Sequence, residues 1–551
     1  MFKNWWRAET GFFFGLWPCF LQLGSIQFLI DPGPYWSTAI GRQILAEGRA
    51  PSAEVFSCTL HGKPWNSHQW LSQCLFALLD RLGGPDGLVL GAATLLAVLF
   101  TWVGHRLLRA GLHWLPTAGF MLLAVMAARY HLLARPHLAT IALLGLTVAR
   151  LADFEFGRVP LRGLLWLPPI FVLWTNLHGG ALGGLASVGL VIFGWLTGFA
   201  TSRLFGHDLN SPLRDMQHAF RAVAIFAACL LATLVNPYGW QLPFGWLQLM
   251  GSPIIRNYIN EHAPLDWLNP FQLPIVFFGL VYLLVLLNLQ SWRQLRVSWL
   301  LPLVWFVLAI DRVRHCTLFA ISAAVMLAEI IPHTRAAAAL AALPSWLFQP
   351  PVEHATPDEP AASPRRWGYS LQPYLLPAAA VLLAGVAQGM HWPVPFVGRG
   401  LAVQNHPNTP LDLLEPLKKN SQPGQPLFND LAYGGFLIYH TKLRIFVDDR
   451  CELYGDEFLG DYFAANAEYR QLNNRVDEEK RQATPEEIAR LPDHFARWEK
   501  QYGIQLDLAL VIKDSGFWFY LENSPRKWRK LAETERKEFR QQAVLFQRAN
   551  R

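Results

Sequence analysis

The chain has 551 residues, of which 52% are hydrophobic and only 16% are charged, and its formal net charge is +7. This composition is too apolar for a soluble multidomain protein and indicates a polytopic membrane protein. The 23 Trp residues fit this class, because indole rings prefer the water–lipid boundary; the excess of Lys and Arg contains no long basic run and fits cytoplasmic loops better than nucleic-acid binding.

Apolar stretches of membrane-spanning character recur along most of the chain. The first follows the basic start MFKNWWRAET and lacks a small-x-small cleavage site, so we interpret it as a retained helix and not as a cleaved signal. Together the stretches predict about eleven spans. They lie at residues 11–30, 86–104, 114–129, 138–151, 163–176, 181–200, 219–235, 271–289, 297–310, 316–332 and 372–390.

The distribution of Lys and Arg predicts how these spans are oriented. When the spans alternate, the basic residues of the short connections fall on the N-terminal side, which is therefore predicted to be the cytoplasm. An odd number of spans places the loop at 31–85 and the region from 392 onward outside, where they can meet. Residues 333–371, rich in Pro, Ala and Ser, predict a flexible cytoplasmic linker between the last two spans.

The loop that follows the first span is too long for a plain connector. Its sequence begins FLIDPGPYW, and Pro32 to Pro34 predict the end of the first helix, which fixes Asp31 at the membrane surface. Residues 67–82 predict an interfacial helix with an apolar face. The loop is therefore interpreted as an amphipathic cover with Asp31 at its hinge; the apolar residues of the predicted helix are Trp70, Leu71, Leu75, Leu78 and Leu79.

Tryptophans and cysteines in this loop allow two further expectations. Trp36, Trp65 and Trp70 are interpreted as anchors at the membrane interface and not as sugar platforms. Cys58 and Cys74 share the loop and could form a disulfide in an oxidising compartment. The six cysteines show no C-x-x-C spacing, so neither a zinc site nor a thioredoxin motif is supported.

Five polar motifs lie in separate connections that the same alternation places on the external side with Asp31. Two of them are flanked by apolar runs of only about 14 to 17 residues, short of the roughly 20 that a bilayer needs, so their Arg and His side chains are expected to be recessed. Guanidinium groups make bidentate contacts to phosphate, and an Arg/His cluster at that depth suits a lipid-linked phosphate. The alternative is that these Arg residues reach lipid headgroups or pair with acids such as Asp311. The motifs are RYHLLARPH (129–137) and DRVRH (311–315), which are the recessed pair, with NLHGG (176–180), NPYGW (236–240) and NEHAPLDW (260–267).

The region after residue 392 has the charge density of a soluble domain. PLFND, LRIFVDD, LDLALVIKD and QAVLFQR predict short buried strands, and 455–470 and 485–502 predict helices, which together indicate a small α/β or α+β domain. Asp448, Asp449 and Arg450 follow the strand IFV, and strand ends of α/β domains often bind ligands. The alternative is an Asp/Arg network that anchors this domain to the membrane part. FNDLAYGGF predicts a helix start or tight turn.

Several of these motifs resemble bacterial membrane proteins of the GT-C glycosyltransferase superfamily. The first loop carries D-P-G-P-Y-W, G-R-Q-I-L-A-E-G, P-S-A-E-V-F-S and H-G-K-P-W-N-S-H-Q-W-L, and N-L-H-G-G, N-P-Y-G and I-F-V-D-D-R-C-E-L-Y-G resemble one bacterial group with that architecture. The resemblance implies a polytopic α-helical GT-C-like membrane domain over 1–391 and an external α/β domain over 392–551. It also implies a glycosyltransferase of the bacterial cytoplasmic membrane that moves a sugar from a polyprenyl-phosphate or polyprenyl-diphosphate donor to an envelope acceptor (glycan, lipid or protein) on the external face.

The resemblance and the required chemistry together assign roles to residues. In that superfamily the first external loop carries an essential acid, and Asp31 matches it here; Pro32 stands where members with paired acids have a second one, which puts a metal-binding role in doubt. Asp31 is the predicted base for the acceptor proton, with helix capping as the alternative. The predicted ligands of the leaving phosphate are Arg129, Arg135, His137, Arg312, Arg314 and His315, and the second-rank substrate contacts are Glu54, His68, His178, Glu261, Asp449 and Arg450.

Purely structural roles for the remaining motifs stay open, and so does a second function for the protein. His178 in NLHGG is as much a satisfied polar group beside a tight turn as a substrate contact, and NPYGW is interpreted as a structural helix stop. No H-E-x-x-H spacing supports a metal site, and a divalent metal is left open. The second function is a non-catalytic transporter or scaffold for envelope polysaccharide assembly; a transporter is expected to place charged residues along a path reaching both faces, whereas the predicted cytoplasmic loops offer little but Lys and Arg.

Overall fold

The computed structural model describes residues 7–206, 210–258, 260–340, 372–403, 408–524, 527–534 and 542–549. The chain divides into two compact units. We call Met1–Gly24, Val89–Phe244 and Ile259–Leu401 the helical unit, and Ser25–Leu88, Gly245–Tyr258 and Ala402–Arg551 the mixed unit. The mixed unit thus groups the long first loop with the C-terminal region.

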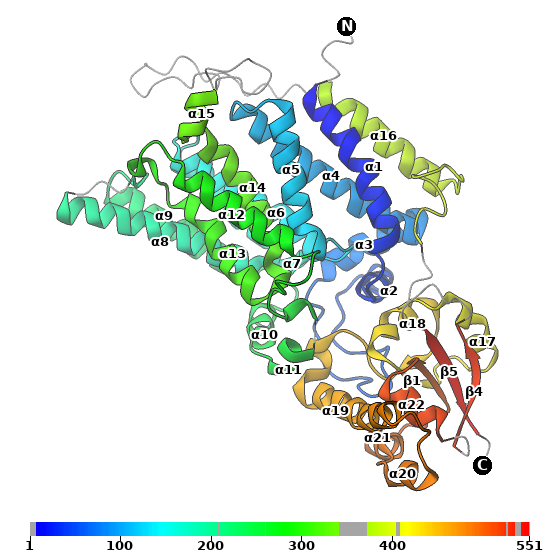
Figure 1. Ribbon diagram of the computed structural model, residues 1–551. Coiled ribbons are helices and arrows are strands. Elements are labelled where there is room, and N and C mark those ends of the chain that lie inside the picture. The colour runs from blue at the N-terminus through cyan, green and yellow to red at the C-terminus, as the bar shows by residue number, and fades with distance from the viewer. Residues whose placement is uncertain are drawn as a thin grey trace. The chain divides into compact units, whose positions relative to one another are not determined.

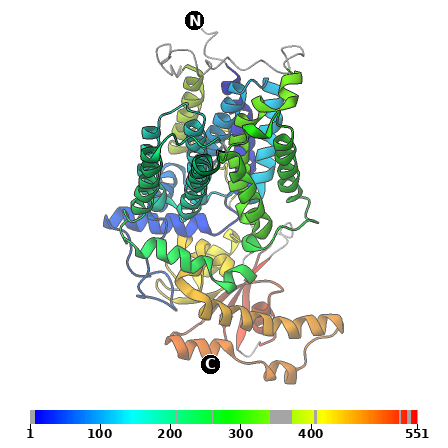
Figure 2. The same ribbon diagram turned by 90° about the vertical axis from the view of Figure 1, so that its left-hand side faces the viewer.

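Each predicted apolar stretch overlaps a helix, and most of these helices run side by side in the helical unit (Figures 1 and 2). Among the described residues, four segments are long and apolar enough to cross a membrane: Pro85–Arg109, His137–Glu155, Ala181–Phe205 and Val313–His333. The same part of the chain has four shorter apolar helices. The helices are α1 (Ala8–Gln27), α4 (Pro85–Arg109), α5 (Trp114–Ala128), α6 (His137–Glu155), α7 (Leu167–Leu177), α8 (Ala181–Phe205), α9 (Met216–Ala232), α12 (Leu273–Leu287), α13 (Leu301–Asp311), α14 (Cys316–Ile330) and α16 (Gln372–Gly389).

Helix α14 forms the centre of the helical unit. It packs against α5, α6, α12 and α13, and every residue from Phe319 to Ile330 is buried. Small side chains such as Ala320, Ala323 and Ala324 let neighbouring helices approach closely, which favours helix association in lipid, where no hydrophobic force drives it. This packing holds the ends of α5, α6, α13 and α14 together, and those ends carry the two Arg/His turns.

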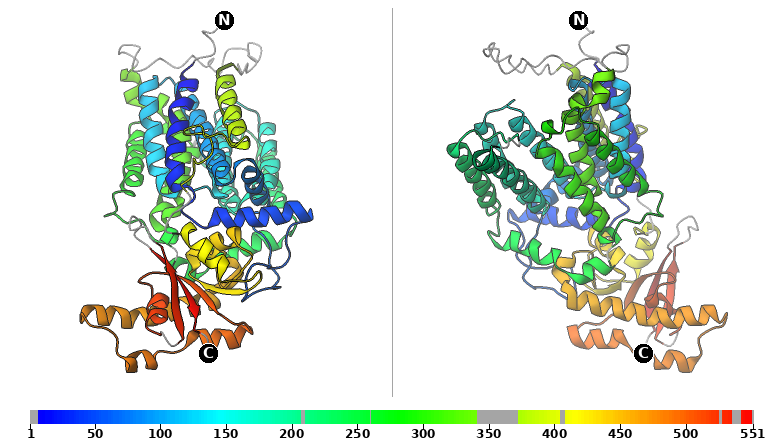
Figure 3. Two further views of the ribbon diagram at one scale, coloured as in Figure 1. Left: turned by 90° about the vertical axis from the view of Figure 1, so that its right-hand side faces the viewer. Right: turned by 60° about the vertical axis from the view of Figure 1, so that its left-hand side comes forward.

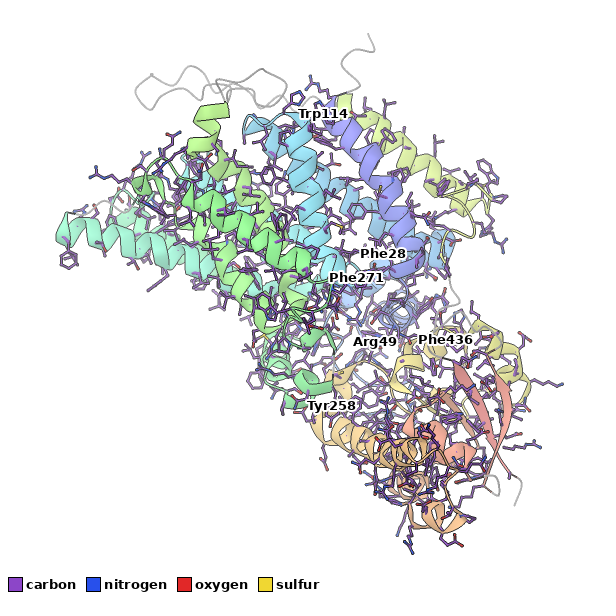
Figure 4. All side chains as sticks on the ribbon, in the orientation of Figure 1. Phe28, Arg49, Trp114, Tyr258, Phe271 and Phe436 are labelled. Carbon is purple, nitrogen blue, oxygen red and sulfur yellow. The ribbon has the colours of Figure 1, made fainter. Side chains whose placement is uncertain are left out.

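Connections of the helical unit gather at its two ends. The ends of α5, α13 and the chain before α12 lie together, since Val313 N–H donates to Ala263 O at 3.0 Å. Figure 4 labels Phe271 at this end and Trp114, the first residue of α5, at the opposite end. Short 3-10 helices shape the turns: η2 (Arg129–His131), η3 (Leu161–Trp166), η4 (Asn260–His262), η5 (Trp292–Gln294), η6 (Ser298–Leu300), η7 (Val313–His315) and η8 (Ile331–His333), followed by α15 (Arg335–Leu340).

The opposite end of the helical unit contains a buried ionic network. Arg106 Nη2 donates to Glu329 Oε1 at 2.6 Å, and Arg158 donates to the other Glu329 oxygen. Asp153 Oδ1 lies 3.4 Å from Arg106 Nη2. These acids differ from the expectation that this end offers little but Lys and Arg, because the carboxylates stand at helix ends where each is matched by a guanidinium.

The mixed unit is built around a five-stranded sheet of order β2-β1-β3-β5-β4. Strand β1 (Pro426–Asn429) is parallel to β2 (Arg444–Ile445) and β3 (Leu508–Ile512), whereas β5 (Ala543–Arg548) is antiparallel to β3 and to β4 (Trp528–Glu533). Figure 3 shows the strands beside α19 to α21. The helices of this unit are α2 (Gly33–Glu47), α3 (Trp70–Gly83), α11 (Pro253–Tyr258), η9 (Leu411–Leu413), α17 (Leu414–Lys419), η10 (Leu431–Tyr433), α18 (Gly434–His440), α19 (Cys451–Glu478), α20 (Pro485–Arg490), α21 (His494–Tyr502) and α22 (Gly516–Glu522), and α10 (Gln241–Met250) reaches into it.

The first loop and the sheet share one hydrophobic core. Ile445 N–H donates to Phe56 O at 3.0 Å and Cys58 N–H donates to Ile445 O at 2.8 Å, so the loop extends the sheet beside β2. Side chains from the loop and from the strands, among them Trp36, Trp65 and Phe428, belong to the same buried cluster. Covering the β2 edge in this way satisfies backbone groups that would otherwise stay unpaired.

Residues 33–47 form helix α2, which was not predicted, because Pro34 suits a first helical turn as well as it stops a preceding one. Two expectations for the first loop are corrected. Trp36 and Trp65 are each only 6% exposed inside the mixed unit, so they are not interface anchors. Cys58 and Cys74 are both free thiols, so the disulfide is not formed.

The predicted strands and helices of the C-terminal region are confirmed, but strand β4 and the short helices α17 and α22 were not predicted. The four predicted strands contain β1, β2, β3 and β5. The predicted helix 455–470 lies within the longer α19, and 485–502 contains α20 and α21. Strand β4 was not predicted, because Trp528–Glu533 is mostly polar and stands at the exposed edge of the sheet. Most of the predicted linker, residues 341–371, lies outside the described residues.

Candidate active site

The two predicted Arg/His turns meet at one end of the helical unit. Arg135 Nη1 donates to Glu261 Oε1 at 2.8 Å, and His131 Nδ1 lies 3.4 Å from the other Glu261 oxygen. Arg314 donates to His262 Nε2. Connections that are far apart in sequence, 129–136, 260–262 and 313–315, thus form one polar group, which we call the Arg/Glu cluster: His131, Arg135, Glu261, His262 and Arg314.

Two further histidines adjoin the Arg/Glu cluster. His137 Nε2 donates to the His131 carbonyl at 2.7 Å, and the two rings stack with centroids 4.2 Å apart. The His178 ring centroid lies 6.5 Å from that of His137. His178 Nδ1 accepts from Gly180 N–H at 3.0 Å and lies 2.8 Å from Thr140 Oγ1.

Burial and neighbouring charge set the protonation of the Arg/Glu cluster. Burial raises the pKa of the Glu261 carboxyl, but the charges of Arg135 and Arg314 outweigh this effect and hold the pKa well below its ordinary value. Burial lowers the pKa of His131 to about 3, assisted by Arg314 and Arg135 and opposed by Glu261. Burial and Arg314 also lower the pKa of His262 to about 3. Near neutral pH, Glu261 is therefore an anion and both histidines are neutral.

This protonation leaves the Arg/Glu cluster with surplus positive charge. Arg135 and Arg314 contribute two cations against the single carboxylate of Glu261, because guanidinium groups stay protonated in proteins. Within the described residues, Arg314 has no carboxylate at ion-pair distance, and its hydrogen bond goes to neutral His262. A half-buried guanidinium with that partner is suited to an anionic ligand.

Three other predicted phosphate ligands have nearby partners of their own. Arg129 lies over the Phe271 ring at 5.3 Å, and Arg312 Nε lies 3.6 Å from Asp311 Oδ2. His315 Nδ1 donates to the Leu308 carbonyl at 3.0 Å. The structure therefore separates Arg135 and Arg314, which share the environment of Glu261, from these three residues, whose role toward phosphate stays a prediction.

Asp31 lies in the mixed unit, at the start of α2. Gly33 N–H donates to Asp31 Oδ1 at 2.8 Å, so the carboxylate does stabilise the helix start. Asp31 is partly exposed, whereas all seven residues from Pro32 to Thr38 are buried. The acid is thus partly exposed at the edge of a buried segment, and its role as base stays a prediction.

Glu54 and Arg450 form a fully buried ion pair inside the mixed unit. Arg450 donates to Glu54 Oε2 at 2.5 Å and, through Nε and Nη2, to both oxygens of Asp448 at 2.8 and 2.6 Å. The guanidinium carbon is 4.9 Å from the Trp65 ring centroid. Burial lowers the pKa of Arg450, but Asp448 and Glu54 outweigh it and raise that pKa above its ordinary value. All three residues of this network belong to the mixed unit, so it joins the first loop to the C-terminal sheet, and an anchor to the membrane part stays a prediction. Asp449 beside it is partly exposed.

The remaining motifs have mainly structural contacts. Asn236 Nδ2 donates to Thr233 O and Gly239 O, both at 2.9 Å, so NPYGW closes its own turn. Asn176 Nδ2 donates to Val235 O at 2.8 Å, which ties NLHGG to that turn. His68 packs edge-on against Trp246 with centroids 6.4 Å apart.

Sequence reasoning did not single out His131, although it stands inside RYHLLARPH. The sequence feature that could have pointed to His131 is the second histidine of the motif, His137. The 3-10 turn at 129–131 brings the two rings into stacking contact. His262 lies in the motif NEHAPLDW, and only the fold brings it to Arg314. Among the described residues no group of three or more His, Cys, Asp or Glu side chains is arranged to hold a metal ion.

These features define a class: a mainly helical membrane protein with a buried Arg/His/Glu group at one end of its helices and a second, mixed unit that contains a small sheet. No protein-family model matches the sequence, and neither does any curated protein. The chain is similar to two crystal structures of ArnT from Cupriavidus metallidurans. The form bound to undecaprenyl phosphate is 14% identical, with 98% of this chain and 97% of that chain covered and a TM-score of 0.47. The apo form is 15% identical, with 97% and 96% covered and a TM-score of 0.48.

Proposed function

We propose that this protein is an integral membrane glycosyltransferase that moves a sugar from a polyprenyl-phosphate or polyprenyl-diphosphate donor to an acceptor of the cell envelope. The observation that carries the proposal is the surplus positive charge of the Arg/Glu cluster, where Arg135 and Arg314 stand against one carboxylate. The motifs of the first loop support the same class. The reaction is proposed to occur on the external face of the bacterial cytoplasmic membrane, with the N-terminus in the cytoplasm.

In the proposed reaction, the bond between the anomeric carbon and the phosphate oxygen breaks, and its electron pair stays on the phosphate. An acceptor oxygen forms the new bond to the anomeric carbon and gives its proton to Asp31. Arg135 and Arg314 stabilise the phosphate that leaves, because their charge is fixed before the reaction and needs no reorganisation. His178 and Glu261 are proposed to orient the donor from beside these guanidinium groups.

The alternative proposal is a transporter or scaffold without chemistry, and one observation favours it. The network of Arg106, Arg158, Asp153 and Glu329 places charge at the end of the helical unit away from the Arg/Glu cluster. Each of these acids already forms an ion pair with an arginine, as expected for residues that hold helix ends together and not for residues that line a transport path. We therefore favour the transferase.

Phosphate binding is tested with farnesyl phosphate, a short polyprenyl monophosphate, and purified protein in detergent. Arg314→Gln removes a charged donor, and we expect affinity to fall by about 10- to 150-fold, the equivalent of roughly 1.5–3 kcal/mol for hydrogen bonds to charged groups. Arg49→Gln is the matched control, since Arg49 is exposed and pairs only weakly with Glu47 at 3.4 Å. Equal affinity of the native protein and Arg314→Gln for farnesyl phosphate would contradict the proposal that Arg314 binds the phosphate.

Transfer itself is tested in cells that carry the native protein or Asp31→Asn at matched membrane levels. Lipid-linked sugars and envelope glycans are compared by mass spectrometry. The transferase predicts that the variant accumulates a donor lipid and loses a glycan modification. If Asp31→Asn behaves as native while deletion of the protein still alters the envelope, the transporter or scaffold is the better account.

A further inference from the structure

The backbone on both sides of Asp31 is held by residues from the C-terminal part of the mixed unit. Asn408 Nδ2 donates to the Ile30 carbonyl at 3.0 Å, immediately before Asp31. On the other side, α18 passes so close to Pro32 that a Cβ added to Gly435 would lie 2.3 Å from the Pro32 carbonyl oxygen. Real Cβ atoms do not approach other atoms this closely, so only glycine fits at residue 435.

Helix α2, which starts at Gly33, packs against the same helix α18. The rings of Tyr35 and Tyr439 meet edge to face with centroids 5.4 Å apart. Tyr439 O–H donates to Asp80 Oδ1 at 2.6 Å, and Arg42 donates to Asp80 Oδ2 at 2.5 Å while it lies over the Tyr439 ring at 4.5 Å. A residue of α18 thus binds side chains of both α2 and α3.

We propose that the C-terminal region positions Asp31, and that Gly435 is the positioning residue through which it acts. The inference rests on the proposed role of Asp31 as base. The partly exposed carboxylate of Asp31 lies next to Pro32, whose backbone is held by the contact with α18. The C-terminal region is then a part of the transfer machinery and not an appended module, because it holds the backbone on both sides of the acid.

The size of the expected effect follows from the contact at Gly435. Ordinary contacts of a Cβ atom begin at 3.4 Å, so Gly435→Ala must separate α18 from Pro32 by about 1 Å. A misplacement of about 1 Å in a reacting group costs transfer rates up to roughly 10²-fold. Asn408→Ala removes one neutral hydrogen bond, and we expect a smaller loss of about 2- to 10-fold.

The test compares Gly435→Ala with Gly460→Ala, a matched control in the same unit. A Cβ at Gly460 would meet only Ile254 Cδ1, at 3.6 Å, which is an ordinary contact. Donor lipid and envelope glycan are quantified in cells at matched protein levels, farnesyl phosphate binding is measured on purified protein, and both glycine variants are combined with Asp31→Asn.

We expect Gly435→Ala to accumulate donor lipid as Asp31→Asn does, to bind farnesyl phosphate with native affinity, and to add no further loss to Asp31→Asn. A purely structural role predicts additive losses instead. The inference is overturned if Gly435→Ala transfers as the Gly460→Ala control does while Asp31→Asn is blocked. If Gly435→Ala fails to fold, Asn408→Ala decides the question through the same three measurements. An inert Asp31→Asn, by contrast, contradicts the proposed function itself.

Discussion

Replacing Arg450 by methionine tests whether the first loop and the C-terminal sheet are held together by the buried ion pair. The side chains of Arg450, Glu54 and Asp448 are 0% exposed. Without the guanidinium, both carboxylates stay buried with no cation beside them. Breaking a buried pair in this way costs about 3–5 kcal/mol, because the remaining charge has lost both its solvent and its partner.

Thermal unfolding followed by tryptophan fluorescence measures this cost, since Trp36 and Trp65 lie 5.9 and 4.9 Å from the Arg450 guanidinium. For a unit of this size, each kcal/mol shifts the Tm by about 2–4 °C, so Arg450→Met should lower the Tm by roughly 6–20 °C. Arg49→Met, which changes an arginine whose side chain is 78% exposed, should leave the Tm unchanged.

A triple variant separates charge from packing. Adding Glu54→Gln and Asp448→Asn to Arg450→Met removes the stranded charges, while the amide oxygen of residue 54 can still accept from the Phe56 and Ser57 N–H groups. We expect most of the lost Tm to return. A triple variant as unstable as Arg450→Met would refute the electrostatic reasoning, and a native Tm for Arg450→Met would refute the anchoring role altogether.

Two further predictions concern single contacts. Gly180→Ala would place a Cβ 2.3 Å from Thr140 Oγ1 and should destabilise the helical unit by about 1–3 kcal/mol, seen as a lower Tm than for Gly119→Ala, where a Cβ meets nothing within 4 Å; equal Tm values would contradict it. Burial raises the pKa of Asp430 to about 6 from 3.8, so the native fold binds its proton more tightly than the unfolded chain does, and stability should fall by about 3 kcal/mol as the pH rises from about 4 to about 6. Asp430→Asn should remove that fall, so the Tm difference between native protein and variant must change across this window.

The helices were predictable because their signal is local. An apolar run long enough for a bilayer must satisfy its own backbone hydrogen bonds, which leaves a helix as the available structure. The strands β1, β3 and β5 were predictable for a similar reason, since each is a short buried apolar segment. Helix α2 was not, because Pro32 and Pro34 mark a helix stop as readily as a helix start, and only packing against α3 and α18 distinguishes the two.

For the candidate site, the sequence predicted which types of residue take part, but not which residues they contact. Arg135 and Arg314 were expected at recessed turns, and their chemistry points to an anion in any arrangement. The partners were not visible, because Glu261 is 126 residues from Arg135 and His262 is 52 residues from Arg314, and only the packing of the helices brings each pair together.

By itself, therefore, the sequence determined that this protein is a helical membrane protein with a small sheet near its C-terminus, since those properties depend on composition and on neighbouring residues. Only the tertiary structure decided that the first loop shares a core with the C-terminal region and that Arg450 belongs to Glu54, 396 residues away. Such long-range pairs form because a buried charge without a partner of opposite charge is costly. The residues near Arg450 in the sequence do not show which distant acid is buried beside it.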